Sequence, residues 1–454
     1  MSMKNYSERL HSVIPGGAHT YSRGDDQYPD NAPSILEKGK GAWVYDPEGN
    51  KYLDYGMGLR AVTLGYDYDE VSEAAIEEIK KGNNLTRASL TELKAAEKMV
   101  ELFPHHQMVK FAKNGSIVTT AAVKLSRGFT GRKFVAMCSE HPFFTYDDWF
   151  IGTTPMDKGI PDENKSLSLK FNYNNIESLQ KLFNDYPEQI ACVILEPATF
   201  VSPCAKNCNA SALSVPNCSS CPNKTENFLH QVQQLCKKNG TVFILDEMIT
   251  GFRWHLKGAQ FTYGIEPDLA TFGKGMANGF ALAALTGKKE IMEQGGILDE
   301  GKERLFLIST THGSEMSAFG AFLKTVEVYE REKVTEHIWD YGSKLINGMN
   351  SISKDLGIQD YFEAGGFGCS PYYFTKDREG QISLPFRTLL SQEMIKEGVL
   401  MPWIALSLSH TEIELEFTLK AVKKALLIYK LALEEGIENY LVGKSIKPVF
   451  RKFN

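Results

Sequence analysis

Two short apolar runs within residues 241–279 each lead to a single charged residue. The run 241–245 (TVFIL) is followed by Asp246, and the run 268–272 (DLATF) is followed, after one glycine, by Lys274. Short apolar runs bounded by turn residues predict buried strands, and open sheets of parallel strands present their functional residues at the carboxyl ends of the strands. We therefore expect an acid and an amine at one edge of a parallel sheet.

An acid and a lysine in this arrangement suit one cofactor in particular. A lysine amine forms a Schiff base with the aldehyde of pyridoxal 5′-phosphate (PLP), and an acid keeps the pyridinium nitrogen of that cofactor protonated. Each residue alone has a more ordinary explanation, because a strand-end Asp is often a helix cap or turn residue and a Lys between glycines is often an exposed loop residue. The pair favours Lys274 and Asp246 as catalytic residues.

The motifs around this pair, LDEMITGFR and FGKGMANG, resemble those of a known family. They are similar to the class III, ornithine-aminotransferase-like PLP enzymes, and most closely to the glutamate-1-semialdehyde 2,1-aminomutase branch. The pattern WVYDPEGNKYLDYGMG is similar to the start of the same family. The resemblance implies an α/β protein of PLP fold type I (aspartate aminotransferase-like), with a mostly parallel central sheet in a large domain and a small α+β C-terminal domain.

Helix and strand patterns alternate from residue 66 to 333, as a parallel sheet requires. We therefore expect a large PLP-binding domain at 66–333, with one of its strands at 305–309 and a cysteine-rich insert at 200–224. Residues 1–65 are interpreted as an N-terminal arm that forms part of the small domain. Residues 334–454 have their own α+β pattern and are expected to form the small C-terminal domain.

The segment Asn114-Gly115-Ser116 follows a predicted strand and begins a predicted helix. Free backbone N–H groups and the helix dipole make such a helix start a favourable anion site. Gly115 and Ser116 match the phosphate loop of the family, and Asn114 takes the place of its serine. Ile117 departs from the pattern, because the aminomutase usually has an acid there, which puts a local hydrogen bond in doubt.

The resemblance also implies contacts to the faces of the cofactor ring. An aromatic residue stacks on one face in the family, and Phe143 is the preferred candidate with Phe144 as the alternative. Both could equally be core residues, as aromatics usually are. Met248 matches the residue that packs on the opposite face, and Glu196 matches the family's Glu-Pro turn near the cofactor.

Residues for the partner subunit and for the substrate are implied in the same way. A threonine at the position of Thr310, or of its neighbour Thr311, reaches the phosphate of the partner subunit in the family, so the match implies a homodimer with shared active sites. Arg23 matches an arginine that holds the substrate carboxylate in the aminomutase branch, and Arg60 lies near a pocket position. A lone arginine is more often an exposed surface residue.

The segment 152–161 (GTTPMDKGIP) bears on the choice of reaction. The aminomutase carries a Gly/Ser-rich mobile gate in this region, and this segment lacks that composition. The leading interpretation is an aminotransferase that moves an amino group from a donor such as glutamate to a carbonyl acceptor. A glutamate-1-semialdehyde aminomutase is the alternative, a PLP-dependent racemase is a weaker one, and a non-catalytic scaffold is the alternative from another class.

Four cysteines lie close together in a segment without a core-forming pattern. Their spacing, Cys204-x3-Cys208-x9-Cys218-x2-Cys221, allows four thiolates to close a tetrahedral zinc site. An iron–sulfur cluster, two disulfides in an oxidising compartment and free thiols are the alternatives. Zinc is preferred over free thiols, and its role would be structural because four Cys ligands leave no open position.

The composition limits the kinds of molecule that this chain is expected to bind. The formal net charge of −6 gives no reason to expect a nucleic acid or an anionic membrane as partner. The N-terminal sequence MSMKNYSERL lacks the apolar stretch of a signal peptide, and no apolar run is long enough to span a membrane. We therefore expect a cytoplasmic enzyme that acts on small molecules.

Overall fold

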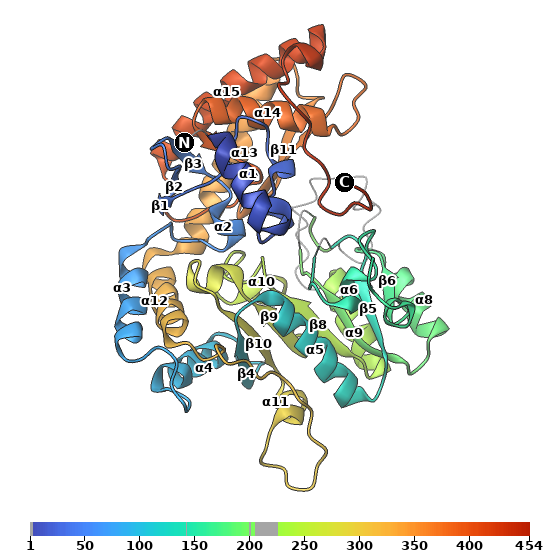
Figure 1. Ribbon diagram of the computed structural model, residues 1–454. Coiled ribbons are helices and arrows are strands. Elements are labelled where there is room, and N and C mark those ends of the chain that lie inside the picture. The colour runs from blue at the N-terminus through green and yellow to red at the C-terminus, as the bar shows by residue number, and fades with distance from the viewer. Residues whose placement is uncertain (1–2, 142, 199–200, 205–225) are drawn as a thin grey trace. The chain divides into compact units, whose positions relative to one another are not determined.

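The computed structural model describes residues 3–141, 143–198, 201–204 and 226–454 (Figure 1). Its contacts divide the chain into a small unit, formed by Met1–Tyr68 with Glu336–Asn454, and a large unit, formed by Asp69–Thr335. Among the described helices, none is both long enough and apolar enough to cross a membrane.

The large unit is built on a seven-stranded sheet in the order β4-β10-β9-β8-β7-β5-β6. Strands β5 to β9 pair in parallel, and β10 is antiparallel to both of its neighbours. This confirms the predicted mostly parallel sheet. The strands are β4 (Met108–Ala112), β5 (Phe134–Cys138), β6 (Ser168–Phe171), β7 (Ile190–Leu195), β8 (Val242–Asp246), β9 (Leu269–Phe272) and β10 (Ala283–Gly287).

Helices of the large unit begin where the sequence supplies capping side chains. Asn114 accepts a hydrogen bond from the N–H of Ile117 at the start of α5 (Gly115–Thr130), and Asn227 caps α9 (Phe228–Asn239) in the same way. Figure 1 shows α5 crossing one face of the sheet. The other helices are α3 (Asp69–Lys80), α4 (Leu90–Leu102), α6 (Asp148–Ile151), α7 (Asp162–Lys165), α8 (Ile176–Asp185), α10 (Gly258–Tyr263), α11 (Lys289–Met292) and α12 (Met316–Glu332).

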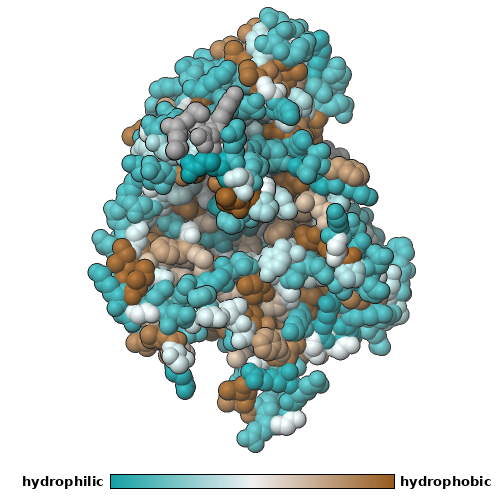
Figure 2. Space-filling view, viewed as in Figure 1, coloured by the Kyte–Doolittle hydropathy of each residue, from teal (hydrophilic) through white to brown (hydrophobic). Residues whose placement is uncertain are grey.

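The strand expected at 305–309 is absent, so that prediction is wrong. Residues 303–310 have no regular secondary structure, and the N–H of Leu305 donates to the carbonyl of Gln294. The Leu305 side chain packs against the backbone at Gly128, where an added Cβ would lie 2.4 Å from it. The apolar run therefore serves side-chain packing rather than strand pairing. Phe306 is 71% exposed, and Figure 2 shows hydrophobic patches on the projecting end of this unit.

The small unit contains a four-stranded sheet in the order β1-β2-β3-β13, in which β3 and β13 pair in parallel. The β2–β3 hairpin turns at Asp46, whose Oδ1 accepts the N–H groups of Glu48 and Asn50 at 3.0 and 2.9 Å. A second sheet pairs β11 with β12. The strands are β1 (Lys38–Lys40), β2 (Trp43–Tyr45), β3 (Lys51–Asp54), β11 (Phe362–Phe367), β12 (Ser370–Thr375) and β13 (Val399–Leu400). The remaining α-helices are α1 (Met3–Val13), α2 (Met57–Arg60), α13 (Val334–Asp355), α14 (Leu384–Lys396) and α15 (Glu412–Glu435).

Four consecutive residues after β3 form a left-handed turn. Their φ angles are 41° at Met57, 57° at Gly58, 61° at Leu59 and 69° at Arg60. Residues that carry a Cβ pay roughly 1–2 kcal/mol each in this conformation, and they adopt it as single residues rather than as runs. A turn of this kind needs strong local contacts to hold it.

The side chain of Asp54 supplies those contacts. Its Oδ1 accepts the N–H of Gly56 at 2.7 Å, and its Oδ2 accepts the N–H of Met57 at 2.9 Å. The Tyr66 hydroxyl donates to the same Oδ2 at 2.6 Å and accepts the N–H of Gly58 at 2.7 Å. Three successive backbone N–H groups are therefore satisfied through one carboxylate and one phenol.

Candidate active site

Asp246 is the last residue of β8 and is 1% exposed. Its Oδ1 accepts hydrogen bonds from the N–H of Met248 and from the Thr271 hydroxyl, both at 3.0 Å. Among the residues that the structure describes, none donates to its Oδ2. Burial raises the pKa of the Asp246 carboxyl to about 6, against the opposing effects of its hydrogen bonds and of the Lys274 charge.

Lys274 follows β9 after Gly273 and begins a single 3₁₀ turn, Lys274–Ala277. The strands β8 and β9 are parallel neighbours with Asp246 opposite Thr271, so both charged residues leave the sheet at the same edge. Lys274 has a φ of 36°, which is unusual for a residue with a side chain. Strained backbone of this kind is concentrated at functional sites.

Met248 brings three distant segments together. A Cβ added at Gly273 would lie 2.6 Å from the Met248 sulfur, and one added at Gly115 would lie 2.9 Å from it. The predicted phosphate loop, the loop that holds Lys274 and the end of β8 therefore meet around one side chain. Both positions need glycine because of this close approach.

The predicted phosphate loop lies at the start of α5 as the sequence indicates. Asn114 Oδ1 accepts the N–H of Ile117 at 3.1 Å, and the Ser116 hydroxyl accepts the N–H of Tyr146 at 3.2 Å. The Ser116 hydroxyl hydrogen can still be donated to an anion. Lys113, directly before the loop, forms a 2.9 Å ion pair with Glu315.

The two candidate stacking aromatics differ in burial. Phe144 is 2% exposed and its carbonyl accepts the Thr119 hydroxyl at 2.9 Å, so it belongs to the core. Phe143 is 46% exposed, and its ring is therefore accessible. Glu196, directly after β7, is buried, and its N–H donates to Nδ1 of His141 at 2.9 Å.

Thr310 and Thr311 are exposed residues of the irregular segment before α12. The carbonyl of Thr311 accepts a hydrogen bond from the Asn84 side chain at 3.1 Å. The ion pair of Lys113 with Glu315 links this segment to the phosphate loop of the same chain.

Sequence reasoning missed two residues of this site, one that donates to Asp246 and one that follows it in the chain. Thr271 donates to it from the neighbouring strand, and the only sequence signal is a hydroxyl side chain in an otherwise apolar strand. Glu247 is completely buried and accepts the N–H groups of Ala259 and Gln260 at 2.9 and 2.7 Å. Burial raises the pKa of the Glu247 carboxyl to about 7. Glu247 thereby ties α10 to the end of β8, and the second acid of the LDE motif was its signal.

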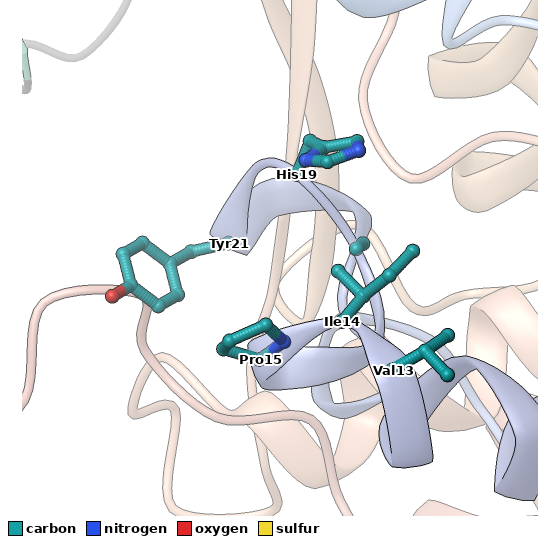
Figure 3. A pocket seen from close by; sticks show the side chains of 6 residues that line it. Val13, Ile14, Pro15, His19 and Tyr21 are labelled. Atoms are coloured by element: carbon teal, nitrogen blue, oxygen red, sulfur yellow. The ribbon is translucent and has the colours of Figure 1, made fainter.

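The two predicted substrate arginines belong to the small unit. Arg23 is exposed and lines a cavity of about 760 Å³ together with Tyr28, Asp54 and Leu59, among others. Arg60 ends the left-handed turn, and its Nη1 donates to the Ser370 hydroxyl at 2.9 Å. A smaller cavity of about 290 Å³ lies in the same N-terminal segment, where Figure 3 shows the Tyr21 ring directed away from the other labelled side chains.

The predicted metal ligands fall mostly outside the described residues. Cys208, Cys218 and Cys221 are not among them, and Cys204 is buried at the edge of the described chain. Within the described ranges, no group of three or more His, Cys, Asp or Glu side chains could hold a metal ion.

The arrangement in the large unit fits PLP. The uncommitted oxygen of Asp246 can accept a hydrogen bond from a ring nitrogen, and the helix start at Gly115 offers N–H groups to a phosphate. Gly115 and Gly273 allow the Met248 side chain to lie against both loops, beside Asp246 and Lys274. The site therefore offers a partner for three groups of this cofactor: Asp246 for the ring nitrogen, the start of α5 for the phosphate and Lys274 for the aldehyde.

Comparisons with known proteins agree with this geometry. 3-Aminobutyryl-CoA aminotransferase of Cloacimonas acidaminovorans is 29% identical over 423 residues, which cover 92% of this chain and 95% of that protein. Glutamate-1-semialdehyde 2,1-aminomutase of Francisella philomiragia is 28% identical over 447 residues, which cover 93% and 97%. The FumI protein of Sphingopyxis sp. MTA144, solved in its PLP internal aldimine form, shares 24% identity and a TM-score of 0.82 over 95% of this chain and 97% of that one.

The match to a family extends over both units. Residues 25–200 and 221–386 match aminotransferase class-III, and these ranges contain both Asp246 and Lys274. Together with the mostly parallel sheet and the acid–lysine pair at its edge, this match shows that the chain belongs to the class III aminotransferases, which are PLP-dependent enzymes of fold type I.

Proposed function

We propose that this enzyme moves an amino group from a donor such as L-glutamate to a carbonyl acceptor. The observation that carries the proposal is the delivery of Asp246 and Lys274 by two adjacent parallel strands, with one oxygen of the buried Asp246 uncommitted. The family match and the aminotransferase name of one relative support it.

Lys274, Asp246 and the start of α5 each have a role in holding the cofactor or moving a proton. Bound PLP supplies an electron sink for chemistry at the carbon that carries the amino group. Lys274 Nζ would hold the aldehyde end of the cofactor and would move the proton at the substrate carbon that carries the amino group. Asp246 Oδ2 keeps a proton on the ring nitrogen, and the start of α5 binds the phosphate through its N–H groups.

Other residues contact the cofactor ring, the substrate and a partner subunit in this proposal. Phe143 and Met248 flank the ring, and Glu196 lies beside it. Arg23 and Arg60 bind an acidic group of the substrate. Thr310 or Thr311 reaches the phosphate of a partner subunit in a homodimer with shared sites, and the enzyme is cytoplasmic. The exposed apolar side chains of Ile297 and Leu298, 73% and 82% accessible, are consistent with such a partner.

The alternative is a glutamate-1-semialdehyde aminomutase, which the name of a second relative favours. The segment 152–161 argues against it. Lys165 pairs with Asp157 at 2.8 Å, and Lys170 Nζ donates to the carbonyl of Thr153 at 2.7 Å. These contacts hold residues 152–161 to the residues that follow them and so oppose the opening that a mobile gate requires. They therefore support the aminotransferase over the aminomutase.

A single-turnover experiment tests the proposal. The yellow holoenzyme is mixed with L-glutamate and no acceptor, and the visible absorbance of the lysine-bound cofactor and the 2-oxoglutarate formed are measured. We expect that absorbance to disappear as one equivalent of 2-oxoglutarate appears. Lys274→Ala should show neither signal, while the exposed Lys289→Ala serves as the matched control.

The opposite result is also informative. An unchanged spectrum with L-glutamate contradicts this donor. Glutamate-1-semialdehyde is then supplied alone, and its conversion to an isomer without any added donor would support the aminomutase instead.

We also propose a structural zinc ion held by Cys204, Cys208, Cys218 and Cys221. Its support is their spacing, and four thiolates would leave no position open for catalysis. Protein purified without chelator should contain one zinc ion per chain. Cys221→Ser should lose it and the buried Cys236→Ser should keep it, and zinc-free wild-type protein would contradict the proposal.

A further inference from the structure

The end of the chain returns along α14 to the N-terminal segment. The N–H of Val442 donates to the Gln392 side chain at 2.8 Å, and the N–H of Ile446 donates to the Thr388 hydroxyl at 3.0 Å. Figure 1 draws this C-terminal tail in dark red, descending from the end of α15. Residues 442–454, here the tail, lie beyond the part of the chain that matches the family, which ends at residue 386.

The tail is fastened to the segment around Asp26. Arg451 Nη2 pairs with Asp26 Oδ2 at 2.5 Å, and the two side chains are only 25% and 32% exposed. The N–H of Lys447 donates to the Asp26 carbonyl at 2.9 Å, and its own carbonyl accepts the Gln27 side chain at 3.0 Å. Both the backbone and the side chain of Asp26 are therefore held by the tail.

The N-terminal segment needs such external support. Residues 15–27 form three single 3₁₀ turns, Pro15–Gly17, Tyr21–Arg23 and Asp25–Gln27, rather than a continuous helix or strand. Short 3₁₀ turns have few and poorly aligned internal hydrogen bonds. Their position is therefore set by what they contact, and the tail supplies the ion pair at Asp26.

The same segment carries Arg23. It lines the cavity of about 760 Å³ together with Asp25, Tyr28 and Asp30. The tail also touches this wall, because Gly443 lies so close to Asp30 that an added Cβ would be 2.1 Å from its carboxylate. Without Arg451, the Asp26 carboxylate would keep, among the described residues, only the hydrogen bond from the Gln27 side chain at 3.2 Å. It lies three positions from Arg23 in the sequence and would then be available to attract the Arg23 guanidinium.

We propose that the tail is a substrate-positioning element and that Arg451 is its principal residue. By engaging Asp26, Arg451 fixes the turn that carries Arg23 and keeps the guanidinium available for an acidic group of the substrate. The inference rests on the proposed function, because it takes Arg23 as a substrate-binding residue.

Four variants test it in the holoenzyme. Arg451→Met removes the ion pair, Arg451→Lys keeps a charge, and a chain that ends at Leu441 lacks the tail. The exposed neighbour Lys452→Met is the matched control. Hydrogen exchange of residues 15–31 reports whether the segment is released, and the L-glutamate concentration that gives half-maximal single-turnover rate reports the effect on substrate.

For Arg451→Met and for the shortened chain we expect faster exchange in residues 15–31. We also expect a half-maximal concentration raised about two- to fivefold, as for the loss of a partly exposed ion pair. The maximal rate should be unchanged, because only binding is affected. Arg451→Lys should recover part of the loss, and Lys452→Met should match wild type.

Unchanged exchange in both Arg451→Met and the shortened chain overturns the inference, even if no substrate is turned over. Faster exchange with an unchanged half-maximal concentration also overturns it.

Arg23→Gln then distinguishes a failure of this inference from a failure of the proposed function. If that variant binds L-glutamate more weakly, the proposed function stands and only the role of the tail fails. If it binds normally, Arg23 is not the substrate residue.

Discussion

Asp54 and Asp246 are each the last residue of a strand, one in the small unit and one in the large unit. They are 4% and 1% exposed, and burial raises the pKa of both carboxyls. The difference lies in their oxygens. Both oxygens of Asp54 accept hydrogen bonds, from Gly56, Met57 and Tyr66, whereas among the described residues only Oδ1 of Asp246 does.

This difference separates a structural carboxylate from one that can bind a ligand. Both oxygens of Asp54 are engaged by the chain, whereas Oδ2 of Asp246 can still accept a hydrogen bond from a bound molecule. The position at the end of a strand and the degree of burial are the same for both residues. Only the count of satisfied lone pairs tells them apart.

The largest contrast is expected when each carboxylate becomes an amide. Asp246→Asn should lower the single-turnover rate with L-glutamate by about 10²–10³-fold, as for removal of one preorganised electrostatic contact, because an amide does not hold a proton on the ring nitrogen. The melting temperature should stay near the wild-type value. Rate and melting temperature are measured on the same preparation, and a variant with the wild-type rate would break the comparison.

Asp54→Asn should show the reverse pattern. An amide has one acceptor oxygen, so its NH₂ group would face either Gly56 or the Met57 and Tyr66 donors. We expect a loss of about 1–3 kcal/mol in the free energy of unfolding. Unfolding in urea measures it, and the visible absorbance of the lysine-bound cofactor should be retained. Normal stability would mean that the left-handed turn is held by other contacts.

The pH dependence of cofactor-free protein sharpens the contrast. The pKa of Asp246 is about 6 in the folded chain and near 3.8 without burial. The folded state therefore binds a proton more tightly between these values, and this stabilisation is present at pH 4 and lost as the pH rises through 6. Asparagine does not titrate, so Asp246→Asn does not lose this stabilisation. As the pH rises from 4 to 8, its free energy of unfolding should increase by on the order of 1–3 kcal/mol relative to that of wild type.

Calorimetric melting of both proteins across this range checks the prediction. A constant difference between them at every pH would show that Asp246 is not the group that titrates.

The smallest expected effects come from the hydroxyl donors of the two carboxylates. Thr271→Val removes a hydrogen bond that lowers the pKa of Asp246, so the acid limb of the single-turnover rate should move to higher pH. Tyr66→Phe should leave that limb in place and reduce stability by about 0.5–1.5 kcal/mol. Equal pH profiles for Thr271→Val and wild type would contradict the link between Thr271 and Asp246.

Sequence reasoning located the large-unit elements well because their signals are local. The run 190–195 is apolar throughout and forms the buried strand β7. Asp246 and Lys274 stood out because each is the first charged residue after such a run. The pairing of β10 against the direction of its neighbours has no such local signal, because pairing depends on distant residues.

The failures have equally physical causes. The run 305–309 is apolar over four residues like a buried strand, but its leucine side chains pack against the backbone at Gly128 and Gly295 instead of belonging to a paired strand. The left-handed turn could not be foreseen, because Met, Leu and Arg all disfavour that conformation by themselves. Arg451 was overlooked because a basic residue near a chain end usually marks nothing more than a solvated terminus.

The pairing of β3 with β13 has a consequence for synthesis on the ribosome. The large unit is one continuous stretch, Asp69–Thr335, whereas the sheet of the small unit pairs β3 with a strand, Val399–Leu400, that is made only after the whole large unit. At about 5–20 residues per second, β3 waits roughly 15–70 s for its partner strand. During that time the strand edge is open to wrong partners, and the charged residues Lys38, Lys40 and Lys51 on these first strands discourage such pairing.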